Sequence, residues 1–167
     1  IIDQLEGAGS GYVISGALRL TGKLDRAALH ASIQAVVQRH ESLRTTIVTE
    51  GDQPQQRIAP NGTVDLPLVD LRHLPGAERL SEAQQLAFGE VQRPFALAQG
   101  PLLRCTLYQL AEDDFVLLVA MHHIISDGWS IGVMSHDVLA FYRQATAGTP
   151  AHLPELSIQP VDYAQWQ

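Results

Sequence analysis

The amino-acid sequence predicts an α/β fold in which a mixed, largely antiparallel sheet packs with helices. Two apolar segments, 102–110 and 115–121, have the length of buried strands, and a short acidic turn separates them. Two other segments, 26–40 and 129–145, repeat apolar residues at helical spacing. With 167 residues and 46% hydrophobic content, the chain is long and apolar enough to bury a sizeable core.

The N-terminal part of the chain predicts a strand, a helix and a second strand. Residues 12–20 alternate loosely between apolar and polar side chains and predict a strand that ends at Gly22. Asp25 is suited to cap the following helix, because its carboxylate accepts hydrogen bonds from free backbone N–H groups. Residues 45–49 are mostly β-branched, which favours a strand. The side chains at helical spacing are Leu29, Ile33, Val36 or Val37, and His40.

The middle of the chain is rich in proline and turn residues. Residues 51–75 contain four prolines and predict short strands joined by loops, with 64–71 as the best strand. The Ser-Glu-Ala-Gln sequence at 81–84 is a capping box, which predicts the start of a helix. That helix should end before Pro94, because proline disfavours the helical conformation in the residue that precedes it.

The last elements are a hairpin and a helix. Segments 102–110 and 115–121 predict an antiparallel hairpin across the turn at 111–114. The helix at 129–145 should end before Gly148 and Pro150. Its apolar face predicts five buried side chains, which are Val133, Met134, Val138, Phe141 and Tyr142.

Composition excludes several classes of function. The net charge is −7 and no basic cluster is present, which argues against binding to nucleic acid or to an anionic membrane. No apolar run has a membrane-spanning length and the first residues are not a signal peptide, so we expect a cytoplasmic protein. The single cysteine, Cys105, excludes an internal disulfide, and its place in a strand predicts a buried, inert thiol.

A histidine pair follows directly on the second strand of the hairpin. Adjacent residues of an extended segment point to opposite sides, so His122 and His123 must differ in their roles. A purely structural histidine is one alternative. A zinc site is disfavoured because HExxH and CxxC spacings are missing. A catalytic triad using Ser126 or Ser130 is disfavoured because the sequence has no GxSxG elbow.

The sequence around this pair, 121–130, resembles the HHxxxDG signature of condensation domains of nonribosomal peptide synthetases. The wider chloramphenicol-acetyltransferase-like superfamily shares its HxxxD core. The resemblance implies that His123 is the catalytic residue and that His122 is an internal hydrogen-bonding residue. It implies that Asp127 holds the loop through a buried pair with an arginine, and that the N–H of Gly128 lies near the developing charge. The following helix would open at Trp129 and Ser130.

Two further segments extend the resemblance. Residues 39–47 are similar to the RHExLRTxF motif of condensation domains, with Ile47 where phenylalanine is usual. The family resemblance makes Arg39 or Arg44 the partner of Asp127, with Arg39 preferred, and His40 a structural residue. The alternative for Arg39 is a surface residue that the helix macrodipole favours. Residues 158–167 are similar to the family's IQYADYAVWQ segment.

The resemblance implies a chloramphenicol-acetyltransferase-like lobe. Residues 1–167 would be the N-terminal lobe of a condensation domain, without the C-terminal lobe that faces it across a cleft. The implied reaction is amide formation between an acyl or peptidyl thioester and an aminoacyl thioester. Both substrates would arrive on 4'-phosphopantetheine arms of upstream donor and downstream acceptor carrier proteins, and the domain itself would bind no cofactor or metal. We expect the isolated 167 residues to be inactive.

Several related functions remain open. An epimerisation domain shares the histidine motif and would use His123 to exchange an α-proton. Trp129 and Ser130 after Asp-Gly are more similar to condensation domains that accept L-configured donors. A coenzyme A-dependent acyltransferase would share HxxxD, but the histidine pair and the 39–47 motif favour carrier-bound substrates. A cyclisation domain would carry a DxxxxD pattern in place of the pair. The non-enzymatic alternative is a carrier-docking module of the same fold.

Overall fold

The computed structural model describes residues 13–125, 131–146 and 157–160. Five strands of the described residues form one sheet in the order β4-β5-β6-β1-β7. β4 pairs with β5 in parallel and the other neighbours are antiparallel, so the predicted mixed, largely antiparallel sheet is confirmed. The strands of this sheet are β1 (Val13–Thr21), β4 (Leu68–Asp70), β5 (Leu103–Ala111), β6 (Asp114–His122) and β7 (Ser157–Pro160).

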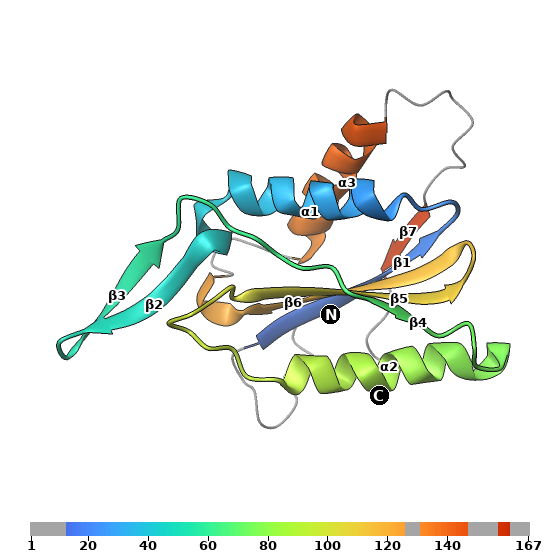
Figure 1. Ribbon diagram of the computed structural model, residues 1–167, viewed down its shortest axis with the longest axis horizontal. Helices are drawn as coiled ribbons and strands as arrows, with labels where there is room; N and C mark the ends of the chain where they lie inside the picture. The colour runs from blue at the N-terminus through green and yellow to red at the C-terminus, as the bar shows by residue number, and fades with distance from the viewer. Residues whose placement is uncertain (1–12, 126–130, 147–156, 161–167) are drawn as a thin grey trace.

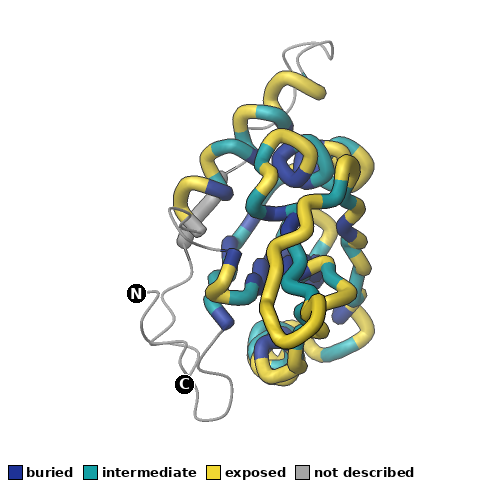
Figure 2. The backbone as a smooth tube through the Cα atoms, turned by 90° about the vertical axis from the view of Figure 1, so that its left-hand side faces the viewer, coloured by how far each residue is buried: buried dark blue, intermediate teal, exposed yellow. Residues whose placement is uncertain are grey.

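Helices cover both faces of this sheet. α1 (Arg26–Arg39) and α3 (Ile131–Thr146) lie on one face, and α2 (Gly76–Gln92) lies on the other (Figure 1). Buried residues are concentrated between these layers, and exposed residues lie on the outer surfaces (Figure 2). We call the two sides of the sheet the α1/α3 face and the α2 face.

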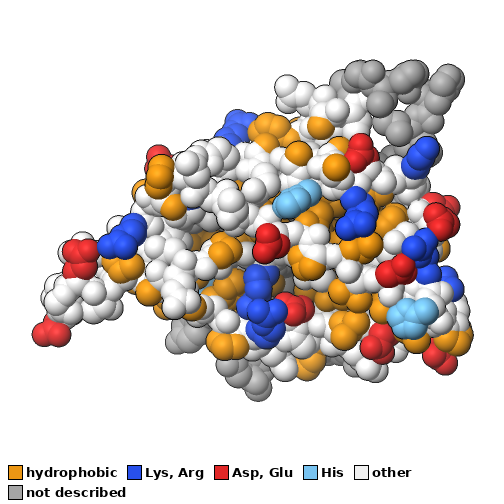
Figure 3. Space-filling view, in the orientation of Figure 1, with side chains coloured by type: hydrophobic (Ala, Val, Ile, Leu, Met, Phe, Trp, Pro, Cys, Tyr) orange, Lys and Arg blue, Asp and Glu red, His pale blue; other side chains and the backbone are white. Residues whose placement is uncertain are grey.

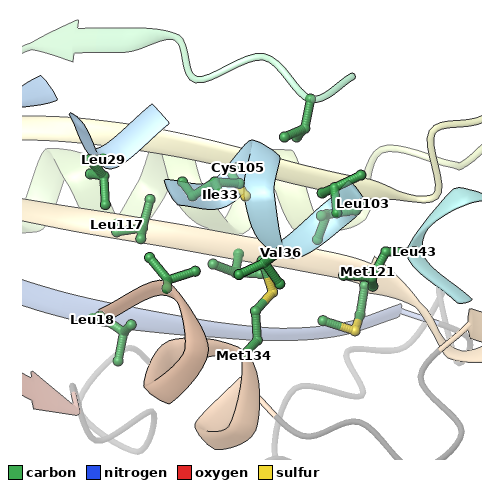
Figure 4. Close-up of a cluster of buried hydrophobic side chains, with 14 of the residues drawn as sticks. Leu18, Leu29, Ile33, Val36, Leu43, Leu103, Cys105, Leu117, Met121 and Met134 are labelled. Atoms are coloured by element: carbon green, nitrogen blue, oxygen red, sulfur yellow. The ribbon is translucent and has the colours of Figure 1, made fainter. Parts of the chain in front are cut away.

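The α1/α3 face holds the larger core cluster. Its side chains come from both helices and from the three central strands, as Figure 4 shows. Ile33 and Val36 of α1 are fully buried, and Met134 of α3 is 1% exposed. Because strands β5 and β6 are covered on both faces, nearly all their residues are buried and the apolar runs are continuous.

The first helix begins where the sequence predicts. Asp25 is the N-cap of α1, and its Oδ1 accepts a hydrogen bond from Ala28 N at 3.0 Å. The backbone N–H of Asp25 donates to Tyr142 Oη at 3.0 Å, which ties this cap to α3. The predicted hairpin is also confirmed, because β5 and β6 pair antiparallel with Leu103 opposite Met121.

Beyond the main sheet, a short 3-10 turn, η2 (Glu41–Arg44), leads from α1 into a two-stranded ribbon. The ribbon consists of β2 (Thr45–Glu50) and β3 (Gln53–Ile58), paired antiparallel. It projects from the body of the molecule, and β3 is exposed along its whole length (Figure 1). The strand predicted at 45–49 and the short strands expected after residue 51 are therefore confirmed.

Three predicted features are wrong in detail. α2 begins at Gly76, so the capping box at 81–84 lies inside the helix and does not start it. The strand predicted at 64–71 is limited to Leu68–Asp70. Val133 is 47% exposed and not buried, because it lies on the outer side of α3, whereas Met134, Val138 and Tyr142 are buried. Phe141 is half-buried against the core.

Tertiary contacts explain the early start of α2. The guanidinium of Arg79 donates to the carbonyl oxygens of Leu74, Leu110 and Arg72 at 2.8–2.9 Å. These bonds hold the preceding loop and the first turn of the helix against the end of β5. A helix supported in this way does not need the local cap that the sequence offers one turn later.

Candidate active site

The candidate site lies at the end of β6. His122 is the last residue of that strand, and its backbone N–H donates to Leu102 O at 2.9 Å. On the other side, β1 pairs with it at Val13. Met121 belongs to the core of the α1/α3 face, so the alternation of the strand directs His122 to the α2 face.

The side chain of His122 is half-buried and hydrogen-bonded to its own turn. Its Nδ1 accepts from the backbone N–H of Ile124 at 3.1 Å. Phe95 packs against the imidazole in an edge-to-face arrangement, with 6.2 Å between ring centroids and an interplanar angle of 87°. Burial lowers the pKa of His122, and the neighbouring His123 lowers it further. Nδ1 is therefore an unprotonated acceptor, and in the neutral imidazole the proton is on Nε2.

His123 has a different environment. It begins the 3-10 turn η3 (His123–Ile125), and its side chain is exposed. Two residues later, Ile125 is 3% exposed and belongs to the core. The turn is thus anchored at both sides of His123, by His122 and by Ile125, while the imidazole of His123 faces outward. The two adjacent histidines differ in exposure, but His123 lies in the 3-10 turn and not in the extended segment that the sequence predicts for the pair.

The remaining residues of the motif lie outside the described residues. These are Ser126, Asp127, Gly128, Trp129 and Ser130. The pair between Asp127 and an arginine, the Gly128 N–H and the opening of the helix at Trp129 and Ser130 therefore stay predictions. In the third matched segment, residues 158–160 belong to β7, which pairs with β1, and 161–167 lie outside the described residues.

The two arginines of the 39–47 motif have different surroundings. Arg39 ends α1 and is exposed. Arg44 is half-buried, and its guanidinium donates to the carbonyl oxygens of Val37 and Ala59. Its aliphatic stem packs so closely on Gly62 that a Cβ there would lie 2.7 Å from Arg44 Cγ. Arg44 therefore braces the end of α1 against the segment that follows β3.

His40 joins the motif to the last helix. Its Nε2 lies 3.2 Å from Asp137 Oδ2 of α3. This contact lies at the C-terminal end of α1, whereas the Tyr142–Asp25 contact lies at the N-terminal end. The two contacts therefore hold α3 to both ends of α1. His40 thus has a structural partner, in the role that the sequence assigns to it.

The described residues also show the environment of the Cys105 thiol, and they can be searched for metal-binding groups and membrane-spanning helices. Cys105 is buried in the core, and burial raises the pKa of its thiol to about 12, so the predicted inert thiol is confirmed. Within residues 13–125, 131–146 and 157–160, no group of three or more His, Cys, Asp or Glu side chains is arranged to hold a metal ion. Among these same residues, no helix combines the length and apolar character needed to cross a membrane.

Two residues beside the histidine pair were not predicted from the sequence. Phe95 contacts His122, and the guanidinium carbon of Arg104 lies 4.0 Å from the centroid of the Phe95 ring. The sequence did offer an indication of Arg104, because burying an arginine in a strand of otherwise buried residues costs free energy unless its guanidinium has partners.

The surface charge agrees with the composition. On the face shown in Figure 3, basic and acidic side chains are interspersed without a continuous basic surface.

Comparison with known proteins links this arrangement to a family. The family model described as "Condensation domain" matches residues 1–167. Phosphinothricin tripeptide synthetase PhsC of Streptomyces viridochromogenes is 42% identical over 166 residues, which are 99% of this chain and 15% of PhsC. Chondramide synthase cmdD of Chondromyces crocatus is 40% identical over 164 residues, which are 98% of this chain and 4% of that protein. The chain thus spans a small part of these relatives.

Solved structures show the same fold. SgcC5 of Streptomyces globisporus matches with a TM-score of 0.75 and 34% identity, over 90% of this chain and 35% of that one. The starter condensation domain of the rhizomide synthetase RzmA matches with a TM-score of 0.75 and 26% identity, over 90% and 36%. The X-domain in complex with OxyB from teicoplanin biosynthesis matches with a TM-score of 0.68 and 31% identity, over 96% and 34%.

Proposed function

The chain belongs to the condensation-domain family, and we propose that it contributes the catalytic histidine to peptide bond formation in nonribosomal synthesis. The donor is an acyl or peptidyl thioester and the acceptor an aminoacyl thioester, each on the phosphopantetheine arm of a carrier protein. The observation that carries this proposal is the pair at the end of β6. His122 is fixed in the fold, and the adjacent His123 is exposed where a substrate can reach it.

In the proposed reaction, the acceptor amine attacks the carbonyl carbon of the donor thioester. A C–N bond forms, the C–S bond breaks, the donor arm leaves as a thiolate and the amine nitrogen loses a proton. An α-amino group has an ordinary pKa of about 8, so little base strength is needed to supply the neutral amine. His123 either accepts the proton or hydrogen-bonds the amine and the tetrahedral intermediate. Holding both arms in one site contributes through proximity.

The proposal also assigns partners to this chain. Residues 1–167 act as the N-terminal lobe, and a C-terminal lobe of the same domain completes the site. An upstream donor and a downstream acceptor carrier protein deliver the substrates, in the cytoplasm, and the domain binds no cofactor or metal of its own. Asp127 holds the loop after the histidines, with Arg39 or Arg44 as its partner. Residues 1–167 taken alone are proposed to be inactive, because the facing lobe is needed to complete the site.

The test uses the full-length protein that carries this chain, with separately loaded donor and acceptor carrier proteins. Intact-mass analysis follows the acceptor-bound product for wild type, His123→Ala and the control His73→Ala, whose histidine is exposed before α2. We expect a loss of about a hundredfold or more in His123→Ala and no change in the control. Product formation at the wild-type rate in His123→Ala would exclude a catalytic role for this residue.

The main enzymatic alternative is an epimerisation domain. It is separated from condensation by running the same reaction in deuterium oxide. Exchange of the α-proton of a single loaded substrate, without transfer to the second carrier, would favour epimerisation. Transfer without exchange would favour condensation.

A non-catalytic docking module is favoured by one specific observation. The chain is 31% identical to an X-domain whose structure was solved in complex with another protein, OxyB. If this chain had that kind of role, neither transfer nor exchange would occur with any loaded pair. The full-length protein would instead retain carrier-protein binding in His123→Ala at wild-type affinity.

A further inference from the structure

We infer that Phe95 and Arg104 form a positioning unit for the catalytic turn, in which the Arg104 guanidinium supports the Phe95 ring and that ring fixes the imidazole of His122 beside His123. The inference rests on the proposed function, because it assigns these residues to the placement of His123. Neither residue is proposed to touch substrate. Both act through His122, which in turn holds the backbone of the turn.

Arg104 is itself held in place by the end of a helix. Its Nη2 donates to Glu90 O at 2.8 Å and to Arg93 O at 2.6 Å, and its Nη1 donates to Pro94 O at 3.4 Å. These carbonyls lie in the last turn of α2 and in the two residues that follow it, where a helix leaves acceptors free and favours a positive charge. The guanidinium is therefore fixed at one position against α2, and a lysine cannot make the same set of bonds.

The fixed guanidinium lies over the ring of Phe95, the residue that follows Pro94. The 4.0 Å distance from Arg104 Cζ to the ring centroid is that of a cation–π contact. Phe95 presents its ring to His122 at 87°, so the two rings meet edge to face. Arg104 and His122 come from neighbouring strands of the sheet. The Phe95 ring thus connects the end of α2 to the end of β6.

The orientation of His122 determines the turn that carries His123. Nδ1 of His122 accepts from Ile124 N, so a rotation of the imidazole removes the bond that closes the turn around His123. The acceptor must also be unprotonated. His123, the next residue, and Arg104, behind the Phe95 ring, are charged or titratable groups near this imidazole. Burial, to which the Phe95 ring contributes, and the neighbouring His123 both lower the pKa of His122 and so favour the neutral form that accepts this bond.

The test substitutes each residue in the full-length protein and pairs it with a matched control. Phe95→Ala is compared with Phe88→Ala, because Phe88 is 47% exposed on α2. Arg104→Met is compared with Arg57→Met, because the Arg57 side chain is 64% exposed on β3 and pairs with Glu50 at the surface. Phe95→Leu keeps apolar volume without the aromatic edge. Thermal unfolding is measured for every variant, so that rates are compared among folded proteins.

We expect kcat of transfer to fall about ten- to a hundredfold in Phe95→Ala and Arg104→Met, with KM for both loaded carriers nearly unchanged. Because Phe95→Ala exposes His122 to water, the pKa of that imidazole should rise toward its ordinary value. The acid limb of the kcat profile should then move to higher pH, a change that a general loss of stability would not produce. Phe95→Leu should also lower kcat, because the aromatic edge is lost, but its acid limb should move less because burial is largely kept. The controls should match wild type.

The outcomes separate this inference from the proposed function. If His123→Ala loses activity while the folded Phe95→Leu and Arg104→Met variants keep wild-type kcat and pH profile, the positioning role is wrong and the catalytic histidine stands. If these variants raise KM and leave kcat unchanged, the unit shapes substrate binding and the inference is likewise overturned. If His123→Ala retains the wild-type rate, the proposed function fails, and the inference fails with it.

Discussion

The two faces of the sheet are built on different principles. The α1/α3 face is filled by large aliphatic side chains, and the space between those helices and the strands is only about 20 Å³. On the α2 face, α2 packs against the sheet with small buried residues, Ala83 and Ala87. A groove of about 430 Å³ lies between α2, β5 and the segment before β4. The first face is a closed core, and the second is less completely filled.

The polar groups of the interior follow the same division. Within the described residues, three buried side-chain atoms have no hydrogen-bond partner, and all three lie on the α2 face: Ser15 Oγ, Arg104 Nε and Tyr108 Oη. His122 also turns to this face. Unsatisfied polar atoms cost stability. The α2 face therefore contains buried polar groups that do not add to stability, and it is the face to which the candidate site at the end of β6 belongs.

The largest expected effect is a truncation in the closed core. Leu117 is 2% exposed on β6, on the α1/α3 face. Leu117→Ala should destabilise the domain by about 3 kcal/mol, because the cavity cannot collapse between two rigid layers. Hydrogen-exchange mass spectrometry on β5 and β6 peptides of the full-length protein measures this loss. The exposed Leu86 gives the control Leu86→Ala, which should change protection by less than about 0.5 kcal/mol. Equal losses in both variants would contradict the comparison.

A smaller effect is expected from a hydrogen-bonded hydroxyl on the same face. Tyr142 is 5% exposed, and its Oη accepts from the backbone N–H of Asp25 at the cap of α1. Tyr142→Phe keeps the ring and removes the acceptor, so it should cost about 1 kcal/mol. The loss should appear in the exchange of amides in the first turn of α1. Unchanged protection there would mean that water replaces the hydroxyl without penalty.

The closed core is also the part that the sequence predicts best. α1 and its Asp25 cap, the β5–β6 hairpin and the buried face of α3 follow from local spacing and apolar content. Each of these sequence patterns lies within a single helix or hairpin, and the tertiary contacts favour the same local structure. The exception is Val133 beside Met134, since a helical pattern fixes the apolar face only to within about one residue at its margin.

Local sequence patterns did not predict the structure around the α2 face correctly. The start of α2 depends on Arg79 and carbonyls that come from three separate positions in the chain. The parallel strand β4 is only three residues long, and its pairing partner β5 is distant in the sequence. The successive contacts from Arg104 to Phe95 and from Phe95 to His122 join residues from three parts of the fold. None of these contacts has a local sequence pattern, although the histidine pair itself has one.

The smallest effect, and the sharpest comparison with Tyr142, is expected at Tyr108. Tyr108 is 1% exposed on the α2 face, and burial together with the charge of Glu90 raises the pKa of its hydroxyl to about 12. The Thr106 side chain opposes this shift, but among the described residues Tyr108 Oη has no hydrogen-bond partner.

Tyr108→Phe removes a buried hydroxyl that makes no bond, so the change in unfolding free energy should lie between zero and a gain of about 1 kcal/mol. Hydrogen exchange of β5 amides in the full-length protein measures it alongside Tyr142→Phe. A loss equal to that of Tyr142→Phe would show that Tyr108 Oη has a partner in solution, such as an ordered water in the groove. The difference between the two faces would then lie in how completely they are packed, and not in how their polar groups are satisfied.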